Sequence, residues 1–246
     1  MTDYRTPEHK ILKQVFRRRL IQWFGRNGRS LPWRRTTDPY KIHVSEIMLQ
    51  QTQVERVLDY YAPFLRRFPT VRKLARARDT SVVRAWEGLG YYARAGNLHA
   101  AARIVVREHA GRYPRTLQDI IALPGIGPST AGAILSFSFR SPAVVLDTNV
   151  ARVLRRIFLG ESGGNGPMNA DLWALAENLL PRAGNIWAYN QGLMDFGATI
   201  CTAWNPHCDV CCLRDRCRWL MAGESTDITP MRRVAEPSAR YGQGKR

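Results

Sequence analysis

All five cysteines of the chain lie between residues 201 and 217, whereas a disulfide framework would spread them over the fold. Four of them follow the pattern Cys201, six residues, Cys208, two residues, Cys211, five residues, Cys217. Thiolates this close in sequence can converge on one centre, and an all-sulfur set suits zinc or an iron–sulfur cluster. Zinc sites mostly join two Cys-x2-Cys pairs, and this stretch has one, so the pattern, weighed with the rest of the sequence, favours a 4Fe-4S cluster over zinc. Cys212 adjoins a ligand and is predicted to be a bystander.

A second stretch with chemical potential is Leu123-Pro-Gly-Ile-Gly-Pro-Ser129, which lies between two expected helices. Gly125 and Gly127 allow the backbone to turn tightly and to expose amide groups at the start of the next helix, where an anion is favoured. Such a turn grips a phosphate without reading a base sequence. Alone, the motif is also compatible with a tight turn that binds nothing.

Two carboxylates lie in positions where function is expected. The helical period from about residue 44 to 68 has an apolar face that is interrupted by a polar set, Glu46, Gln50, Gln51 and Gln53. Asp147, in Leu146-Asp-Thr-Asn149, precedes another helical run. It suits a helix N-cap, a role that can coexist with a catalytic one.

The charge of the chain limits the kind of partner. The 246 residues suffice for one large domain or two modest ones, and 37 Lys and Arg against 20 Asp and Glu give a formal net charge of +17. This balance indicates a polyanionic partner. No stretch approaches the roughly 18 apolar residues of a membrane span, which excludes a membrane protein. The first ten residues lack an apolar signal core, so we expect a cytoplasmic protein.

The elements that must position these residues are predicted to be helices, because helical periods dominate the chain. The fold class is therefore expected to be all-α. The expected helices run over 7–24, 44–68, 71–77, 80–87, 93–109, 116–122, 131–139, 149–158, 169–180 and 187–200. Residues 223–246 have no apolar periodicity and are predicted to form a flexible basic tail.

Taken together, these motifs resemble a known family. Residues 123–129 resemble the helix-hairpin-helix of the base-excision DNA glycosylases that include endonuclease III, in which an acidic residue follows about twenty positions later, as Asp147 does. The cysteine spacing is also similar to the cluster of that family. Four further motifs resemble the MutY-type adenine DNA glycosylases, and the match runs from about residue 10 to 220: Leu31-Pro-Trp-Arg34, Ser45-Glu-Ile-Met-Leu-Gln-Gln-Thr-Gln53, Gly88-Leu-Gly-Tyr-Tyr-Ala-Arg-Ala95 and Ser129-Thr-Ala-Gly-Ala133.

The resemblance implies a two-lobed helical protein that binds double-stranded DNA across its cleft. One lobe is expected to be a six-helix barrel with the hairpin, residues 31–141. The other is expected to combine residues 1–30 with 142–222 and to hold the 4Fe-4S cluster. A monomer, associated with the nucleoid, is expected.

The resemblance also implies the chemistry. Breaking an N-glycosidic bond passes through an oxocarbenium-like state, so an acid should protonate the departing base and an anion should stabilise the sugar. By similarity, Glu46 is the acid, Asp147 stabilises the cation directly or through a covalent intermediate, and Asn149 supports Asp147. Burial should keep Glu46 protonated near neutral pH by raising its pKa.

The target base must leave the duplex to be reached. Tyr91 and Gln51 resemble the side chains that fill the gap, whereas core packing is an alternative for the neighbouring Tyr92. Trp33, Arg34 and Gln191 resemble groups that line an adenine pocket. The remaining residues expected to contact DNA are Gln50, Thr52, Gly125, Gly127 and Ser129.

Ser129 stands where endonuclease III-type enzymes have a lysine that forms a Schiff base and cuts the strand. A serine cannot do this. The chain is therefore predicted to be a monofunctional glycosylase that leaves an abasic site.

The substrate stays open between related bases. The family usually continues into a nudix-like domain that helps to recognise 8-oxoguanine opposite adenine, and the 246 residues contain no counterpart. We expect removal of adenine from G:A or 8-oxoG:A pairs. One alternative is a related branch that removes thymine or uracil opposite guanine, to which Gly192-Leu-Met-Asp-Phe196 is similar; Thr148, where glycine is usual, could narrow the pocket. Another is a DNA damage-binding module without catalysis.

Overall fold

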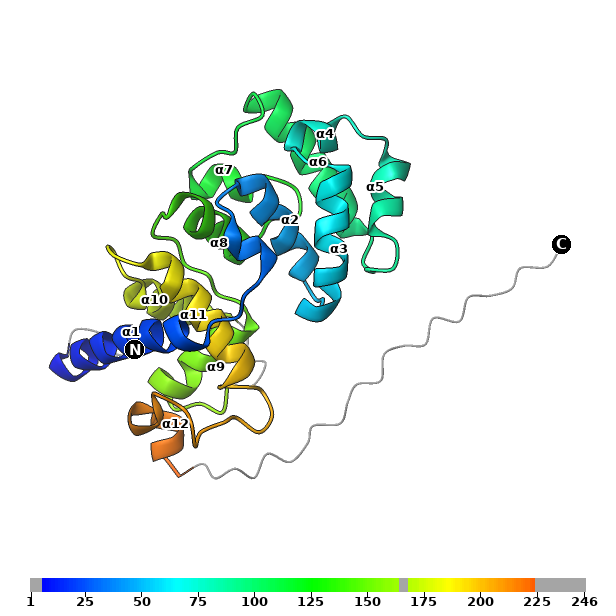
Figure 1. The fold of residues 1–246 in the computed structure, drawn as a ribbon. Coiled ribbons are helices and arrows are strands. Elements are labelled where there is room, and N and C mark those ends of the chain that lie inside the picture. Colours follow the sequence, from blue (N-terminus) through cyan, green and yellow to red (C-terminus); the bar gives the residue numbers. More distant parts are fainter. Residues whose placement is uncertain (1–5, 164–167, 224–246) are drawn as a thin grey trace.

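The computed structural model describes residues 6–163 and 168–223 (Figure 1). The predicted tail therefore lies, apart from Gly223, outside the described residues. Within the described ranges the regular elements are helices, which confirms the all-α fold class. Their bounds are α1 Pro7–Asn27, η1 Pro32–Arg35, α2 Pro39–Leu49, α3 Val54–Arg67, α4 Val71–Ala75, α5 Asp79–Trp86, α6 Ala93–Glu108, α7 Leu117–Ile121, α8 Pro128–Phe139, α9 Thr148–Leu154, η2 Arg155–Leu159, α10 Ala170–Leu179, α11 Ile186–Thr199, η3 Arg214–Arg216 and α12 Arg218–Met221.

Two hydrophobic cores give the molecule its two lobes. The barrel lobe is built from α2 to α8 around buried side chains such as Ile47, Phe64 and Trp86. The second lobe packs α1 against α9 to α12 around side chains such as Phe16 and Phe196. We propose that these cores correspond to the expected division into residues 31–141 and residues 1–30 with 142–222.

The predicted helix over residues 44–68 was wrong, because the structure divides it. A helix begins five residues earlier, where the Asp38 side chain accepts a 2.9 Å hydrogen bond from the Tyr40 amide and Pro39 fills the first turn. It ends at Leu49, and Gln51 adopts a left-handed backbone with φ of 56° before α3 begins. The interruption brings the glutamines to the surface of the lobe.

The segment that leads to Asp147 is pressed against α8. A Cβ at Gly132 would come within 1.8 Å of the Val144 carbonyl oxygen, so only glycine permits this approach. The Ser129 hydroxyl also accepts a 3.2 Å hydrogen bond from the Leu146 amide. Both contacts fix the position at which the chain enters α9.

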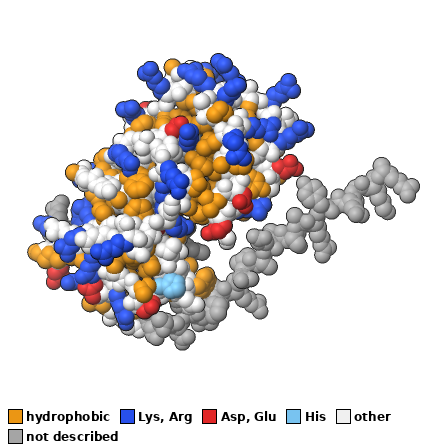
Figure 2. Space-filling view, viewed as in Figure 1, with side chains coloured by type: hydrophobic (Ala, Val, Ile, Leu, Met, Phe, Trp, Pro, Cys, Tyr) orange, Lys and Arg blue, Asp and Glu red, His pale blue; other side chains and the backbone are white. Residues whose placement is uncertain are grey.

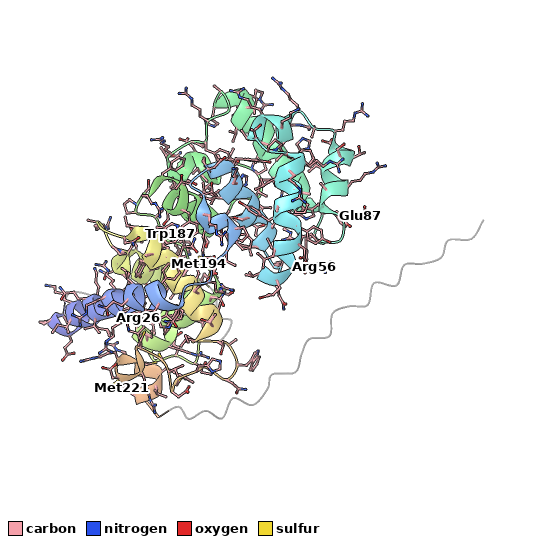
Figure 3. All side chains as sticks on the ribbon, viewed as in Figure 1. Arg26, Arg56, Glu87, Trp187, Met194 and Met221 are labelled. Carbon is pink, nitrogen blue, oxygen red and sulfur yellow. The ribbon has the colours of Figure 1, made fainter. Side chains whose placement is uncertain are left out.

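Helix α11 joins the two lobes. Met194 packs against both cores, and Figure 3 places Met194 and Trp187 in the zone where the lobes meet. The buried Asn190 amide donates 2.9 Å hydrogen bonds to the Ser136 hydroxyl of the barrel lobe and to the Ala143 carbonyl in the segment between α8 and α9. The two lobes therefore share direct packing and hydrogen bonds along α11. Among the described residues, no helix is both long and apolar enough to cross a membrane.

Candidate active site

A cavity of about 540 Å³ opens between the lobes, a size that suits a small ligand. Elements from both lobes contribute to it. Its lining includes apolar groups such as Trp33 and Met194, and polar groups such as Arg34, Glu46, Thr52, Asp147, Asn149 and Gln191.

Glu46 lies one turn from the end of α2 and lines the cavity from the barrel lobe. Burial raises the pKa of Glu46 to about 8, and the nearby Asp147 carboxylate adds to the rise while Arg34 opposes it. A carboxyl in this state is protonated at neutral pH. It can therefore donate a proton to a bound molecule.

Asp147 faces Glu46 from the second lobe, as the N-cap of α9. Its carboxylate accepts a 2.7 Å hydrogen bond from the Val150 amide. Burial raises the pKa of Asp147, while hydrogen bonds from Val150 and Asn149 and the charge of Arg152 counteract the rise. These donors partly offset the effect of burial and stabilise the Asp147 anion, whereas at Glu46 the charge of Arg34 opposes the rise.

Arg34 is anchored to a carboxylate that sequence reasoning missed. Asp195 is fully buried and accepts hydrogen bonds of 2.7 and 2.8 Å from Arg34 and of 2.9 Å from the Arg29 amide. Burial alone would raise the pKa of Asp195, but the bonds and charges of Arg34 and Arg29 hold that pKa below its ordinary value. The remaining Arg34 Nε donates a 2.6 Å bond to Gln191 Oε1. Arg34 and Gln191 therefore present fixed polar atoms to the cavity.

The aromatic wall of the cavity is Trp33. Its ring packs edge-on against Tyr61 with 5.4 Å between centroids, which leaves the indole 5% exposed. Thr52 also lines the cavity, whereas Thr148 is exposed and does not line it. Thr148 therefore does not narrow this space.

Beside the cavity, two exposed side chains sit on strained backbone. Gln51 and Tyr91 have φ of 56° and 49°, in the left-handed region that bulky residues rarely adopt. Tyr91 is 61% exposed, and together with Gln50, Gln51 and Tyr92 it lines a shallow surface hollow. Tyr92 is also exposed, so the core-packing alternative for it was wrong. Strain of this kind persists where surrounding structure enforces it, which is typical of functional loops.

The enforcing group is Arg94, to which the sequence analysis gave no role. Its buried guanidinium donates to the carbonyls of Ile47 and Met48 at 3.1 and 2.9 Å and also to the Gln50 carbonyl. The same guanidinium lies 5.3 Å from the centroid of the Tyr91 ring. One side chain thus ends α2 and supports the exposed tyrosine. The only signal in the sequence is its place inside the motif of residues 88–95.

The hairpin lies next to this edge. Gly125 has φ of +77°, and Gly127 caps the N-terminus of α8. Both glycines are exposed. The Gln50 amide donates a 3.2 Å hydrogen bond to the Gly125 carbonyl. The hairpin, the glutamines and Tyr91 therefore form one continuous edge of the barrel lobe.

The four predicted thiol ligands line one cavity in the second lobe, and Cys212 does not line it. The cavity wall also includes Arg156, His207 and Trp219. Among the described residues, no group of three or more Cys, His, Asp or Glu side chains is arranged to hold a metal ion. The four thiols thus line one shared space.

Two buried arginines on one face of the α9–η2 run hold the thiol loop. Arg152 donates to the Cys201 carbonyl at 2.7 Å and to Asn149 Oδ1 at 2.8 Å. Arg156 donates to the Thr202 carbonyl at 2.7 Å and to the Cys201 sulfur at 3.4 Å. Its guanidinium also lies 4.7 Å from the centroid of the Trp219 ring. The thiol loop is therefore hydrogen-bonded to α9, which Asp147 caps, and to η2, which follows it.

The chain is similar in sequence to known DNA repair proteins. The family model of HhH-GPD superfamily base excision DNA repair proteins matches residues 44–178. The chain is 42% identical over 205 residues to an adenine DNA glycosylase of Buchnera aphidicola subsp. Baizongia pistaciae, across 83% of this chain and 58% of that protein. It is 40% identical to an adenine DNA glycosylase of Mycobacterium tuberculosis, across 87% of this chain and 70% of that protein.

A solved structure of a thermostable thymine-DNA glycosylase is 31% identical, with a TM-score of 0.80 across 87% of this chain and 98% of that one. This likeness confirms the two-lobed glycosylase fold. The chain spans less than two thirds of the length of the Buchnera protein.

Proposed function

This chain belongs to the HhH-GPD superfamily of base excision DNA repair proteins, and from that premise we propose that it is a DNA glycosylase that removes mispaired adenine. The observation that carries the proposal is the pair of carboxyls, Glu46 and Asp147, that face each other across one cavity with environments suited to an acid and to an anion. Identities of 40% and 42% to proteins named adenine DNA glycosylase support adenine as the base.

The reaction follows from the roles of the two carboxyls. Glu46 gives its proton to N7 of the flipped adenine, so that the base leaves as a neutral molecule while the N-glycosidic bond breaks. The bonding electrons depart with the base, and the Asp147 carboxylate stabilises the positive charge left on the sugar. Water then adds to the sugar carbon and releases a proton. The product is an abasic site.

The edge of the barrel lobe supports base flipping. Tyr91 and Gln51 are exposed, close to the cavity and held in strained conformations, which suits side chains that enter a base stack. The hairpin amides at Gly125 and Gly127 are placed to bind a phosphate of the same duplex. Arg34 and Gln191 offer hydrogen bonds to the edge of the flipped base.

Ser129 supports a monofunctional reaction. Its hydroxyl is engaged with the Leu146 amide and carries no amine for a Schiff base. The strand should therefore stay intact until the abasic site is cut by alkali.

We propose that the thiol cavity holds a 4Fe-4S cluster. Cys201, Cys208, Cys211 and Cys217 line it together, and four thiolates are the ligand set that such a cluster takes. The buried Trp219 indole lines the same cavity, and its N–H has no hydrogen-bond partner among the described residues. When bound, the cluster supplies a rigid anchor for the loop. The chain's own residues hold it through the four thiolates and the two arginines.

Thymine opposite guanine is the second candidate, because the likeness to the thymine-DNA glycosylase structure covers nearly all of that chain. Both activities use the same two lobes. We further propose that the enzyme acts as a cytoplasmic, nucleoid-associated monomer on double-stranded DNA with one mismatched or oxidised pair.

One assay separates these possibilities. Labelled duplexes with A opposite G, A opposite 8-oxoguanine, T opposite G and U opposite G are incubated with the protein and then treated with alkali. Cutting of the adenine strand, absent in Glu46→Gln, is the expected result. Cutting at thymine but not at adenine would show that thymine, not adenine, is the base removed. Binding without any cutting would show that the protein is a damage-binding module without catalysis. Cutting before alkali would contradict the monofunctional reaction.

A further inference from the structure

The end of the barrel lobe farthest from the cavity carries a dense group of cations that the proposed reaction does not use. Between the end of α3 and the start of α5 lie six exposed cationic side chains, here called the arginine end: Arg66, Arg67, Arg72, Lys73, Arg76 and Arg78. The stretch from 66 to 78 contains no Asp or Glu. Figure 2 shows Lys and Arg side chains gathered along the upper edge of the view, over α4 and the neighbouring end of α6.

These cations surround a hollow rather than a flat face. Arg67, Arg72, Lys73 and Arg76 line a depression of about 430 Å³ to which no carboxylate contributes. Asp79 follows the stretch directly, but it is shared by Arg103 at 2.8 Å and His99 at 3.0 Å. The local charge is therefore strongly positive and open to solvent.

The arginine end faces away from the proposed reaction. Val54 lines the active-site cavity at the start of α3, and Arg67 lines the hollow at its end. At 1.5 Å per residue the two ends of this helix are roughly 20 Å apart. Helix α6 runs the same way, from beside Tyr91 toward α4 (Figure 1). The arginine end therefore lies about one helix length from the cavity.

The chemistry of the surface favours a phosphate backbone. Arginine guanidinium groups bind phosphate oxygens through paired hydrogen bonds, and lysine adds a point charge. A protein partner is usually held by apolar or aromatic anchors, and among the described residues the exposed large hydrophobic side chains all lie outside the stretch from 66 to 78. The surface therefore suits a polyanion read by charge alone.

We propose that the arginine end is a second DNA-binding surface, which holds the backbone of another duplex segment while the first segment occupies the cleft. The inference rests on the proposed function only in taking the first occupant of the cleft to be duplex DNA. With two surfaces, the enzyme passes directly from one segment to the next without full release. The enzyme then continues its search for rare mispairs on the next segment without first dissociating into solution.

The test variant is Arg66→Gln/Lys73→Gln/Arg76→Gln. It spares Arg67, which stacks over the Phe68 ring, and Arg72, which donates to the Ala110 carbonyl. The control, with the same loss of charge, is Lys10→Gln/Arg18→Gln/Arg182→Gln, at exposed positions of the other lobe. Circular-dichroism melting checks that both fold.

The measurement is the rate at which the full chain leaves a fluorescent, undamaged duplex as the concentration of unlabelled competitor duplex rises. Wild type and control should leave faster in proportion to competitor, and the test variant should show at least a fivefold smaller slope with unchanged excision from a short duplex. The proposal would be overturned if the wild-type rate did not depend on the competitor, or if the control lost as much of the slope as the test variant. It would also be overturned if polyglutamate, used as the competitor in place of DNA, accelerated dissociation while unlabelled duplex did not. Absence of excision in every protein would instead refute the proposed function, because undamaged duplexes still report on the second surface.

Discussion

At the scale of residues, the proposed reaction depends on different environments for two carboxyls of similar intrinsic acidity. Glu46 lies in a recess where its charged form loses solvation, and the Asp147 charge adds to that effect. Asp147 caps a helix and gains backbone and side-chain donors that Glu46 lacks. The sequence indicated both residues, because one interrupts an apolar face and the other precedes a helix. The difference between their environments comes from packing between lobes and cannot be read from local sequence.

The pH dependence of excision should report Glu46. With a pKa of about 8, Glu46 is protonated below that pH and loses its proton above it, so the single-turnover rate constant should fall about tenfold per pH unit on the alkaline side. At acid pH the rate should fall as Asp147 gains a proton. The control Glu87→Gln, at an exposed position, should leave the profile unchanged. A rate that stays flat from neutral pH to pH 10 would exclude Glu46 as the proton donor.

The buried Asp195 should matter more for stability than a surface carboxylate with a similar partner. Asp195→Asn leaves the Arg34 and Arg29 guanidinium groups without their anion and should lower the free energy of unfolding by about 3–5 kcal/mol at pH 7. Asp215→Asn breaks the pair with Arg19, in which the Asp215 side chain is 55% exposed, and should cost about 0–1 kcal/mol. Urea unfolding measures both.

The contribution of Asp195 to the free energy of unfolding depends on pH with a defined sign. The folded-state pKa of Asp195 is lowered, so its contribution is fully present above the unfolded pKa of about 3.9 and is lost as the pH falls through the folded value. Equal losses in Asp195→Asn and Asp215→Asn at neutral pH would show that the buried network contributes no more than a surface pair.

At the scale of elements, sequence periodicity located most helices but not the break between α2 and α3. Polar residues interrupt the apolar face of the run over 44–68, but the face resumes at Val54, so periodicity alone joins the two segments into one helix. At the break, the guanidinium of Arg94, more than forty residues away, donates hydrogen bonds to the Ile47 and Met48 carbonyls near the end of α2. A tertiary contact thus accompanies the bend at Gln51, and local sequence does not reveal that contact. Positions such as this are where periodicity is expected to fail.

The link between η2 and the thiol loop gives a prediction at this scale. Arg156→Gln removes bonds to the Ser162 and Thr202 carbonyls and to the Cys201 sulfur, and hydrogen bonds to a charged donor are each worth about 1.5–3 kcal/mol. Iron and acid-labile sulfide per chain should fall several-fold, with a matching loss of visible absorbance.

The matched control is Arg216→Gln, whose partner is the exposed Asp215. It should retain a full complement of iron and sulfide. Unchanged iron in Arg156→Gln would show that the loop does not depend on this arginine, and zinc in place of iron in the wild type would refute the cluster itself.

At the scale of the whole molecule, the distribution of charge separates binding from chemistry. Many Lys and Arg side chains of the described residues are exposed, as in the arginine end, whereas Arg34 inside the cavity is paired with the fully buried Asp195. Phosphate contacts at the surface release counterions and depend steeply on salt, while buried pairs are screened much less. Duplex affinity and excision from the bound state should therefore respond differently to ionic strength.

Raising salt from 50 to 200 mM should increase the Kd for a short mismatched duplex by about a thousandfold or more, as for proteins that contact six to ten phosphates. The single-turnover rate constant, measured with DNA fully bound, should change less than about twofold, because the proton donor and the anion act inside the cavity. Filter binding and alkali cutting at each salt concentration give the two quantities. The arginine-end variant should keep the same salt slope as wild type for one short duplex, since that surface engages only a second segment; a shallower slope would place the arginine end in the first contact.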